Sequence, residues 1–495
     1  MTDIVEDVVV EAEGAAAGTA AGGKVRDLTQ GPIGRTLIMF ALPTLFANVL
    51  QSLNASINMV WIGRFLGESA LAATSNATNV IFLAFSATFG FGMSATILVG
   101  QNMGRRDIDG ARRAVGAAVG LFLCMSVVVT IGGLLLTDRL LHLMATPPDA
   151  IPLASAYLKV MFLTMPASFI MVLMMMALRG AGDSLTPLWF MIVGLVLDAG
   201  LNPFFIAGIG PFPKLGIAGS AVATLIANSV GLIGIMIVIY ARDLPIRLRG
   251  AEFRYLIPPL PLLKLIVGKG LVMAAQMFVF TMSGLLMLGM VNHTGVATTA
   301  AYGVALQIWN YVQMPSMAVG AAVSAMAAQN IGAGRWDRVS QITNKGLIYN
   351  LILTTVLVAL ITVFDRAALG LFLGPDSPAM PIAQHIQYIA GGSFIISGMM
   401  LVLFGTVRAN GAVIGPLIVM FLGLVVGRAG FAFFGRHWLG QDALWWSFPF
   451  GSTVVTILAW AYYLKAPWRK VALADVAQRA EHGDIAQRAK HADGH

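Results

Sequence analysis

Long apolar stretches, separated by short polar segments, follow one another from about residue 32 to residue 465. An α-helix needs about 20 mainly apolar residues to cross the hydrocarbon core of a bilayer. Twelve stretches reach or exceed that length: 35–63, 69–103, 111–136, 151–178, 186–208, 216–241, 262–291, 297–331, 338–364, 380–407, 413–435 and 443–465. The pattern predicts an all-α polytopic membrane protein with twelve transmembrane helices. Several exceed one straight crossing, so we expect tilt or kinks.

The composition excludes an ordinary soluble enzyme and a disordered chain. Of 495 residues, 58% are hydrophobic and 11% are charged, whereas soluble domains carry about 25% charged residues. The formal net charge of +8 would suit a nucleic-acid-binding protein, but cationic cytoplasmic loops account for it in a membrane protein. We therefore expect no nucleic-acid partner. The single cysteine, Cys124, excludes an intramolecular disulfide and a thiolate metal cluster.

The ends of the chain differ from its middle. Residues 1–31 hold several acids and an Ala/Gly run, without the basic and apolar segments of a signal peptide. We expect a flexible cytoplasmic tail there and a second cytoplasmic tail over residues 466–495. Between them we expect a six-helix lobe over 32–241, a cytoplasmic linker over 242–261 and a second six-helix lobe over 262–465.

The positive charges predict the orientation. With the N-terminus placed inside, most of the 31 Lys and Arg residues fall on the inner side, as cytoplasmic loops require. We therefore expect a multi-pass protein of the cell's inner (plasma) membrane with both termini cytoplasmic.

The two halves of the chain repeat one another. Three blocks match at offsets of 228 or 229 residues: Gly67–Ala73 with Gly295–Ala301, Gln101–Gly104 with Gln329–Gly332, and Arg179, Gly182 and Pro187 with Arg408, Gly411 and Pro416. Because each half has an even number of spans, the two lobes share one orientation and are related by a pseudo-two-fold axis along the membrane normal. That arrangement is typical of secondary transporters, which bind substrate between their lobes.

Short motifs along residues 33 to 465 resemble the MATE (multidrug and toxic compound extrusion) family in order and spacing. They are Pro43, Trp61–Gly67 with Ala70–Ala73, Val99–Gly104, Arg179–Asp183 with Thr186–Pro187, Gly216–Thr224, Ala300–Gly303 and Gln329–Gly334. The resemblance implies a secondary-active exporter of drugs or metabolites, in which two lobes alternate access and a cation is exchanged for the substrate.

Of the 23 acidic residues, only Asp198 lies well inside a predicted span. Such a carboxylate is costly unless it is neutralised, paired or hydrated, and it usually marks an ion pathway. Asn202 follows one helical turn later on the same face, directly before Pro203. Proton-coupled MATE proteins commonly carry an Asn and an Asp at this spacing, so the resemblance implies an ion-coupling pair with the two residue types exchanged. The alternative is a structural hydrogen bond between helices.

The first predicted helix carries a polar face. Its members fall within an arc of about 80° at 100° per residue: Asn48, Gln51, Ala55 and Asn58. Asn54 lies on the flank. MATE relatives usually hold an Asp at the place of Asn58, so the resemblance implies a relay with one carboxylate, which Asn58 assists by hydrogen bonding to Asp198 or by offering its carbonyl to a cation. Pro43 is expected to let this helix bend. The alternative is a face that only joins helices.

The second half lacks a buried acid, so we expect ion coupling in the N-terminal lobe. Its polar and aromatic span residues are candidates to line the substrate cavity: Gln276, Gln307, Trp309, Asn310 and Gln313. Packing between helices is the alternative for each of them.

The sequence carries no HExxH, P-loop or Gly-x-Ser-x-Gly motif, so we expect no enzyme, no catalytic residues, no cofactor and no metal site. We interpret the chain as a monomeric exporter of small amphipathic or cationic compounds that works within the lipid bilayer. A proton is the favoured coupling ion, since one carboxylate suffices for it. Sodium is the rival, with oxygens from Asp198, Asn202 and Asn58. The alternative function is a flippase for lipids or lipid-linked saccharides in the same superfamily. Flippase cavities are often rich in Arg, and here Arg428 alone lies mid-span.

Overall fold

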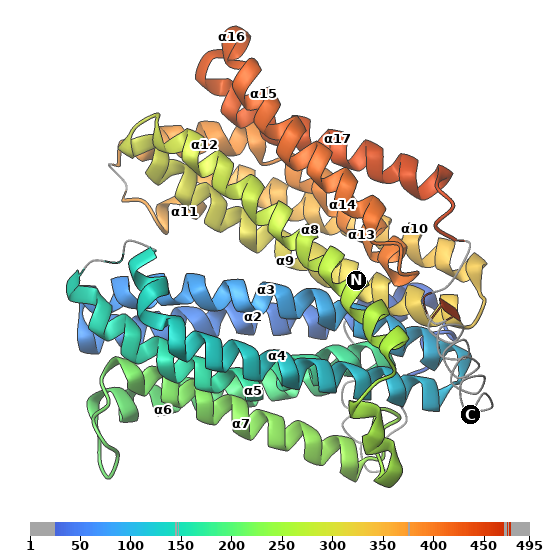
Figure 1. The fold of residues 1–495 in the computed structure, drawn as a ribbon. Helices are drawn as coiled ribbons and strands as arrows, with labels where there is room; N and C mark the ends of the chain where they lie inside the picture. The colour runs from blue at the N-terminus through green and yellow to red at the C-terminus, as the bar shows by residue number, and fades with distance from the viewer. Residues whose placement is uncertain are drawn as a thin grey trace, which may run out of the picture. The chain divides into compact units, whose positions relative to one another are not determined.

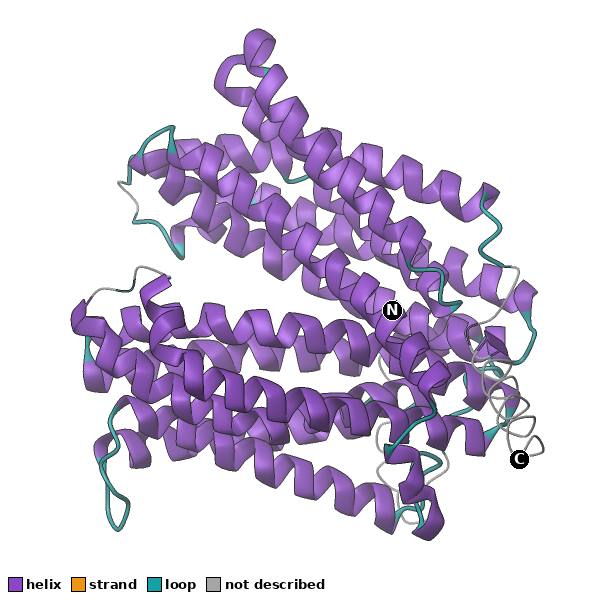
Figure 2. Cartoon of the chain, viewed as in Figure 1, coloured by secondary structure: helices purple, strands orange, loops and turns teal. Residues whose placement is uncertain are grey.

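The computed structural model describes residues 25–143, 146, 148–374, 377–469, 473, 475 and 476. All regular secondary structure in this part of the chain is helical (Figure 2). The chain divides into two compact units. The first comprises Met1–Phe85 and Leu98–Leu263, and the second comprises Ser86–Ile97 and Lys264–His495.

The first unit is built from six long helices, which correspond to the first six predicted spans, although Ser86–Ile97 of the second helix belongs to the second unit. They are α2 (Ile33–Leu66), α3 (Glu68–Arg105), α4 (Ile108–Leu143), α5 (Ile151–Ala181), α6 (Leu185–Ala207) and α7 (Ile217–Ala241) (Figure 1). Helix α6 packs against both α2 and α7, and α5 packs against α4 and α7. Helices α2 and α7 therefore both lie against α6.

The second unit contains the other six spans and several short helical pieces. Its elements are α8 (Leu260–Asn292), α9 (Val296–Gly332), α10 (Trp336–Val363), α11 (Asp365–Gly370), α12 (Ala379–Ala390), α13 (Ser393–Ala409), α14 (Ile414–Met420), a π-helix (Phe421–Gly427), α15 (Arg428–Phe434), α16 (Arg436–Leu439) and α17 (Ala443–Lys465). Helix α9 packs against α10, α12 and α13, and α17 packs against α13 and α15.

Ten helices among the described residues are long and apolar enough to cross a membrane, and the bent pair α12–α13 makes an eleventh span. Helix α9 has the length of a span, but its Gln and Asn side chains lower its hydropathy. With α9, each of the twelve predicted stretches corresponds to a helical span, and the all-α polytopic fold is confirmed.

Two predicted spans are less regular than the apolar pattern indicates. The stretch 380–407 is broken into α12 and α13, which meet at an angle of 47°. The break falls at Gly391 and Gly392, and a Gly pair is a common site for a helix bend. The stretch 413–435 contains a π-helical segment, where Gly423 lies against Val455 of α17 so closely that a Cβ atom would overlap the valine side chain.

The predicted tails lie mostly outside the described residues, which exclude 1–24 and nearly all positions after 469. Their described parts pack onto the helices. Leu28 is fully buried, Trp468 is buried beside Trp336 and Tyr463, and Asn410 donates a hydrogen bond to the Trp468 carbonyl.

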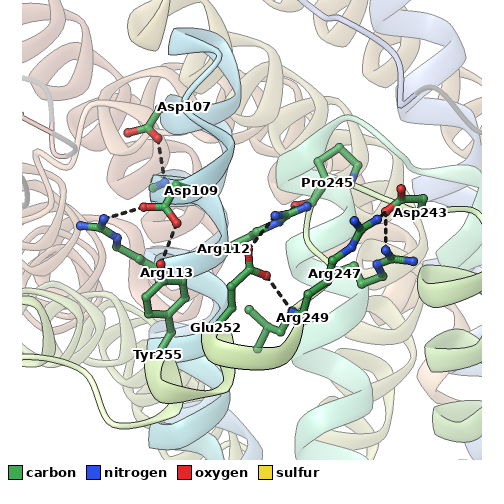
Figure 3. Close-up of polar contacts among 12 residues, drawn as sticks. Asp107, Asp109, Arg112, Arg113, Asp243, Pro245, Arg247, Arg249, Glu252 and Tyr255 are labelled. Carbon is green, nitrogen blue, oxygen red and sulfur yellow. Dashed lines mark hydrogen bonds and ion pairs between the residues drawn. The ribbon is translucent and has the colours of Figure 1, made fainter.

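The segment between the two six-helix halves folds against α4 through charged and polar contacts (Figure 3). It includes a short 3-10 helix, Gly250–Leu256. Nη1 of Arg112 lies 2.7 Å from Oε1 of Glu252, and its Nε donates to the Pro245 carbonyl at 3.1 Å. The Tyr255 hydroxyl donates to Asp109 at 2.7 Å. Residues that we predicted as a linker are thus attached to the first unit at several points.

Two glycines of α4 allow this close approach. A Cβ atom at Gly116 would lie 2.5 Å from Cβ of Tyr255, and one at Gly120 would overlap the Leu256 carbonyl oxygen. The two positions are four residues apart and therefore lie on one face of the helix. Small residues at this spacing let backbones pack closely in membrane helices, and here they accept the linker.

Candidate functional site

Asp198 is buried among the helices of the first unit. It lies on α6 and is 1% exposed. The helix continues through Pro203, which has no N–H to donate to the preceding turn. No Lys or Arg forms an ion pair with Asp198 among the residues that the structure describes. The carboxylate must therefore be stabilised by neutral groups.

Four side chains donate hydrogen bonds to this carboxylate. Nδ2 of Asn54 and Nδ2 of Asn58 lie 2.9 and 3.0 Å from Oδ2. Nδ2 of Asn202 and the Thr224 hydroxyl each lie 3.1 Å from Oδ1. The donors come from α2, α6 and α7, so the carboxylate joins three helices. A carboxylate with four donors is satisfied in its ionised form without a proton of its own.

The amides around Asp198 are also connected with one another. Nδ2 of Asn202 reaches Oδ1 of Asn58 at 2.9 Å and the Asp198 backbone carbonyl at the same distance. Oδ1 of Asn54 and Oδ1 of Asn202 are buried without a hydrogen-bond donor in the described part of the chain. Two acceptor atoms therefore belong to the amides around the carboxylate, where they can accept a hydrogen bond from an added proton or bind a cation.

The structure brings together Asp198, Asn202 and Asn58 as the sequence predicted, but the polar face of α2 is turned differently from our expectation. Asn54, which we placed on the flank, is a direct partner of Asp198. Asn48 and Gln51 make no hydrogen bond within the described residues. Asp198 accepts hydrogen bonds from Asn54 and Asn58, which lie one helical turn apart on α2. In this rotation of α2, the edge of the face that carries Asn48 and Gln51 is turned away from Asp198. Pro43 is buried within α2, which continues through it.

Two residues near Asp198 were missed by the sequence reasoning. Thr224 donates to the carboxylate, and Tyr157 of α5 lies close enough to interact with it electrostatically. Thr224 had a detectable signal, because Ser220, Thr224 and Asn228 recur every fourth residue and form a polar line on the apolar helix α7. Tyr157 had no such signal in the sequence.

The five candidates for cavity lining are divided by the structure. Gln276 and Trp309 are buried inside the second unit, where Gln276 donates to the Val413 carbonyl and Trp309 donates to Gln387, each at 2.7 Å. These polar atoms join helices within the unit, which is the alternative that the sequence left open for them. Gln307 and Asn310 are exposed and Gln313 is half-buried.

Comparisons with known proteins agree with this architecture. The family model MatE matches twice, over residues 43–204 and 273–433, at a spacing close to that of the internal repeat. "Probable multidrug resistance protein YoeA" of Bacillus subtilis is 34% identical over 446 residues, covering 90% of this chain and 96% of the relative. "Probable multidrug resistance protein NorM" of Thermotoga maritima is 25% identical over 450 residues, covering 89% and 94%.

A solved structure shows the same fold. It is the outward-facing conformation of a multidrug resistance MATE family transporter of the MOP superfamily, which superposes with a TM-score of 0.82 at 20% sequence identity. The superposition covers 92% of this chain and 99% of that structure. Both the duplicated family match and the membrane-spanning helices lead to one conclusion: the chain is a multi-pass membrane protein that belongs to the MatE family.

Proposed function

We propose that this protein exports small amphipathic or cationic compounds across the plasma membrane in exchange for an inward-moving cation that binds at Asp198. The observation that carries the proposal is a buried carboxylate, held by four neutral donors from three helices and without a basic partner among the described residues. The names of the relatives support multidrug compounds as the cargo. In this proposal both termini lie in the cytoplasm, and the two lobes give the substrate alternating access to the two sides of the membrane.

The contacts of Asp198 suggest how a proton would change the site. A proton on Oδ2 creates an O–H donor that faces the N–H groups of Asn54 and Asn58. Rotation of the Asn54 amide would remove this conflict, since its Oδ1 has no donor in the described residues and would then accept the new proton. Binding of the proton would thereby exchange donor and acceptor in the hydrogen bond between Asn54 of α2 and Asp198 of α6, and release of the proton would restore them.

The driving force for the exchange is sufficient for such a switch. Each positive charge that moves inward across 100 mV releases about 2.3 kcal/mol, which is comparable to the contribution of a hydrogen bond to a charged group, about 1.5–3 kcal/mol. We favour the proton as the coupling ion because one carboxylate is enough to carry it. Sodium would instead need the oxygens of Asp198, Asn58 and Asn202 as ligands.

Separate ion gradients test the proposal. Purified protein in liposomes should export ethidium when a proton gradient is imposed and should not respond to a sodium gradient at equal pH. Ethidium export under the sodium gradient alone would show that sodium is the coupling ion. Absence of ethidium movement under both gradients would contradict the exporter proposal.

A matched pair on α2 tests the turned polar face. Asn54→Leu removes one of the two amide donors to Oδ2, and we expect proton-driven ethidium export to fall about tenfold or more. Asn48→Leu removes an amide of the same helix that makes no hydrogen bond within the described residues, so its export rate should stay near that of the wild type. Equal effects of the two changes would show that Asn54 has no special part in coupling.

A further inference from the structure

Arg428 is a cation inside a span of the second unit, yet no acidic side chain in the described part of the chain forms an ion pair with it. It begins α15, within the apolar segment Ile414–Phe434. Among the described residues of this unit, the acids are confined to loops and helix ends: Asp337, Asp365, Asp442 and Asp475. A charged group within the membrane is costly and usually marks a pathway or a binding site.

The protein satisfies little of the hydrogen-bonding capacity of Arg428. A guanidinium group has five N–H donors in a fixed plane. Its single hydrogen bond within the described residues is a long one, from Nη1 to the Ser283 hydroxyl at 3.4 Å. Nε is buried without an acceptor. The guanidinium carbon lies 4.5 Å from the centre of the Phe448 ring, which supports the charge but accepts no proper hydrogen bond.

A second unmatched donor lies beside it. Tyr302 of α9 is fully buried, and its hydroxyl has no hydrogen-bond partner in the described part of the chain. The centre of its ring lies 6.2 Å from that of Phe448, the same ring over which the Arg428 guanidinium lies. A buried hydroxyl is normally paired, so both groups lack the acceptor that a negatively charged ligand would provide.

The backbone of α17 packs closely against Arg428 at Gly451. A Cβ atom at Gly451 of α17 would lie 3.5 Å from Nε and 3.1 Å from Cβ of Arg428. The π-helix Phe421–Gly427 directly precedes the arginine, and π-helical segments are frequent at functional sites. The arginine itself is half-buried, so part of its side chain is exposed.

We propose that Arg428, together with the Tyr302 hydroxyl, binds an oxyanion of the transported compound, a carboxylate or a phosphate. Planar guanidinium groups bind such oxyanions through two parallel hydrogen bonds. The inference rests on the proposed function, because it assigns part of the cargo to the second unit. It extends the cargo from cationic compounds to compounds that also carry an acidic group.

Dye binding to the purified full-length protein tests this site. The protein is placed in phosphatidylcholine nanodiscs, and binding of carboxyfluorescein, an anionic dye, and of ethidium is followed by fluorescence polarisation. In Arg428→Gln we expect carboxyfluorescein binding to weaken about tenfold or more, with ethidium binding unchanged. Inorganic phosphate should displace carboxyfluorescein from the wild type. Equal carboxyfluorescein affinity of the two proteins would overturn the proposal.

Two further variants separate a binding role from a structural one. Tyr302→Phe removes a hydroxyl that makes no hydrogen bond in the described residues, so it should weaken carboxyfluorescein binding without lowering the melting temperature. Arg408→Gln removes another half-buried arginine of the same unit, which lies in the last turn of α13 with its guanidinium over the Phe404 ring, and should leave the binding of both dyes unchanged. Equal loss of carboxyfluorescein binding in Arg408→Gln would count against a specific site.

The outcomes also distinguish this inference from the proposed function. If the wild type binds and exports ethidium but does not bind carboxyfluorescein, the inference fails and the exporter stands. If Arg428-dependent carboxyfluorescein binding occurs without ion-driven export, the exporter proposal fails and the site stands. A last control uses nanodiscs that contain phosphatidylglycerol. If this lipid occupies the Arg428 site and carboxyfluorescein cannot displace it, the oxyanion belongs to a lipid headgroup. The assignment of the site to the cargo is then overturned.

Discussion

Asp198→Asn is expected to abolish the export of ethidium against its concentration gradient. Asparagine is close in size to aspartate but cannot take up and release a proton, so the exchange cycle loses its coupling ion. The new amide can still accept hydrogen bonds, and rotation of Asn54 would accommodate its N–H group as it would accommodate a bound proton. The variant should therefore fold and resemble the protonated state. The measurement is ethidium movement in liposomes under an imposed proton gradient.

A second acid of the same unit provides the control for this experiment. Asp138 bonds to Ser155 at 2.7 Å near the ends of α4 and α5 and is largely exposed. Asp138→Asn removes the same charge, and its export should remain close to that of the wild type. If Asp198→Asn still accumulates ethidium uphill, the carboxylate is structural and the coupling must lie elsewhere.

Gly120→Ala is expected to weaken the attachment of the linker to α4. A methyl group at this position would overlap the Leu256 carbonyl, and backbone cannot yield as a side chain does. Overpacking of this kind costs about 1–3 kcal/mol. We expect the melting temperature of the purified protein to fall by several degrees, and trypsin to cleave more rapidly after Arg247 and Arg249 (Figure 3).

Gly132 of the same helix is the matched control. A Cβ atom there meets no other atom within 4 Å, and alanine is favoured over glycine inside a helix by about 1 kcal/mol. Gly132→Ala should therefore leave the melting temperature unchanged or raise it, and trypsin cleavage of the linker should not change. Similar behaviour of the two variants would mean that the close packing at Gly120 does not hold the linker.

The sequence was sufficient for the fold because the bilayer imposes a simple rule. A span must be helical and apolar over about 20 residues, so each span was visible as a stretch, and the matching motifs revealed the repeat. The break at Gly391 and Gly392 and the π-helix before Arg428 were not visible in this way. A local bend or an extra residue in a turn leaves the hydropathy of the stretch unchanged.

The candidate site was only partly predictable from the sequence. Asp198, Asn58 and Asn202 were found because polar groups are rare in apolar helices. Asn54 was misplaced because periodicity gives the width of a polar face and not its rotation toward a neighbour. The hydrogen bonds of Gln276 and Trp309 inside the second unit were not predictable, because the same periodicity does not distinguish a cavity wall from the interior of a helix bundle.

The contacts of the linker were likewise not predictable, because they depend on the tertiary fold. The arginines of the linker and of the start of α4 were interpreted as charges that orient the chain in the membrane. Their pairing with specific acids required the fold: the partners Arg112 and Glu252 are 140 residues apart in the sequence. The glycines of α4 that allow this contact are indistinguishable in the sequence from Gly132, which meets no other atom within 4 Å.

Proton release on substrate binding is the most direct test of the account. Purified protein in a lightly buffered solution is mixed with ethidium while the pH is recorded, first for the wild type and then for Asp198→Asn. At a starting pH low enough for Asp198 to be protonated, we expect the wild type to release about one proton per bound ethidium, since a single carboxylate exchanges it, and the variant to release none. Equal release from both proteins, or binding to the wild type without any release, would contradict a proton exchanger centred on Asp198.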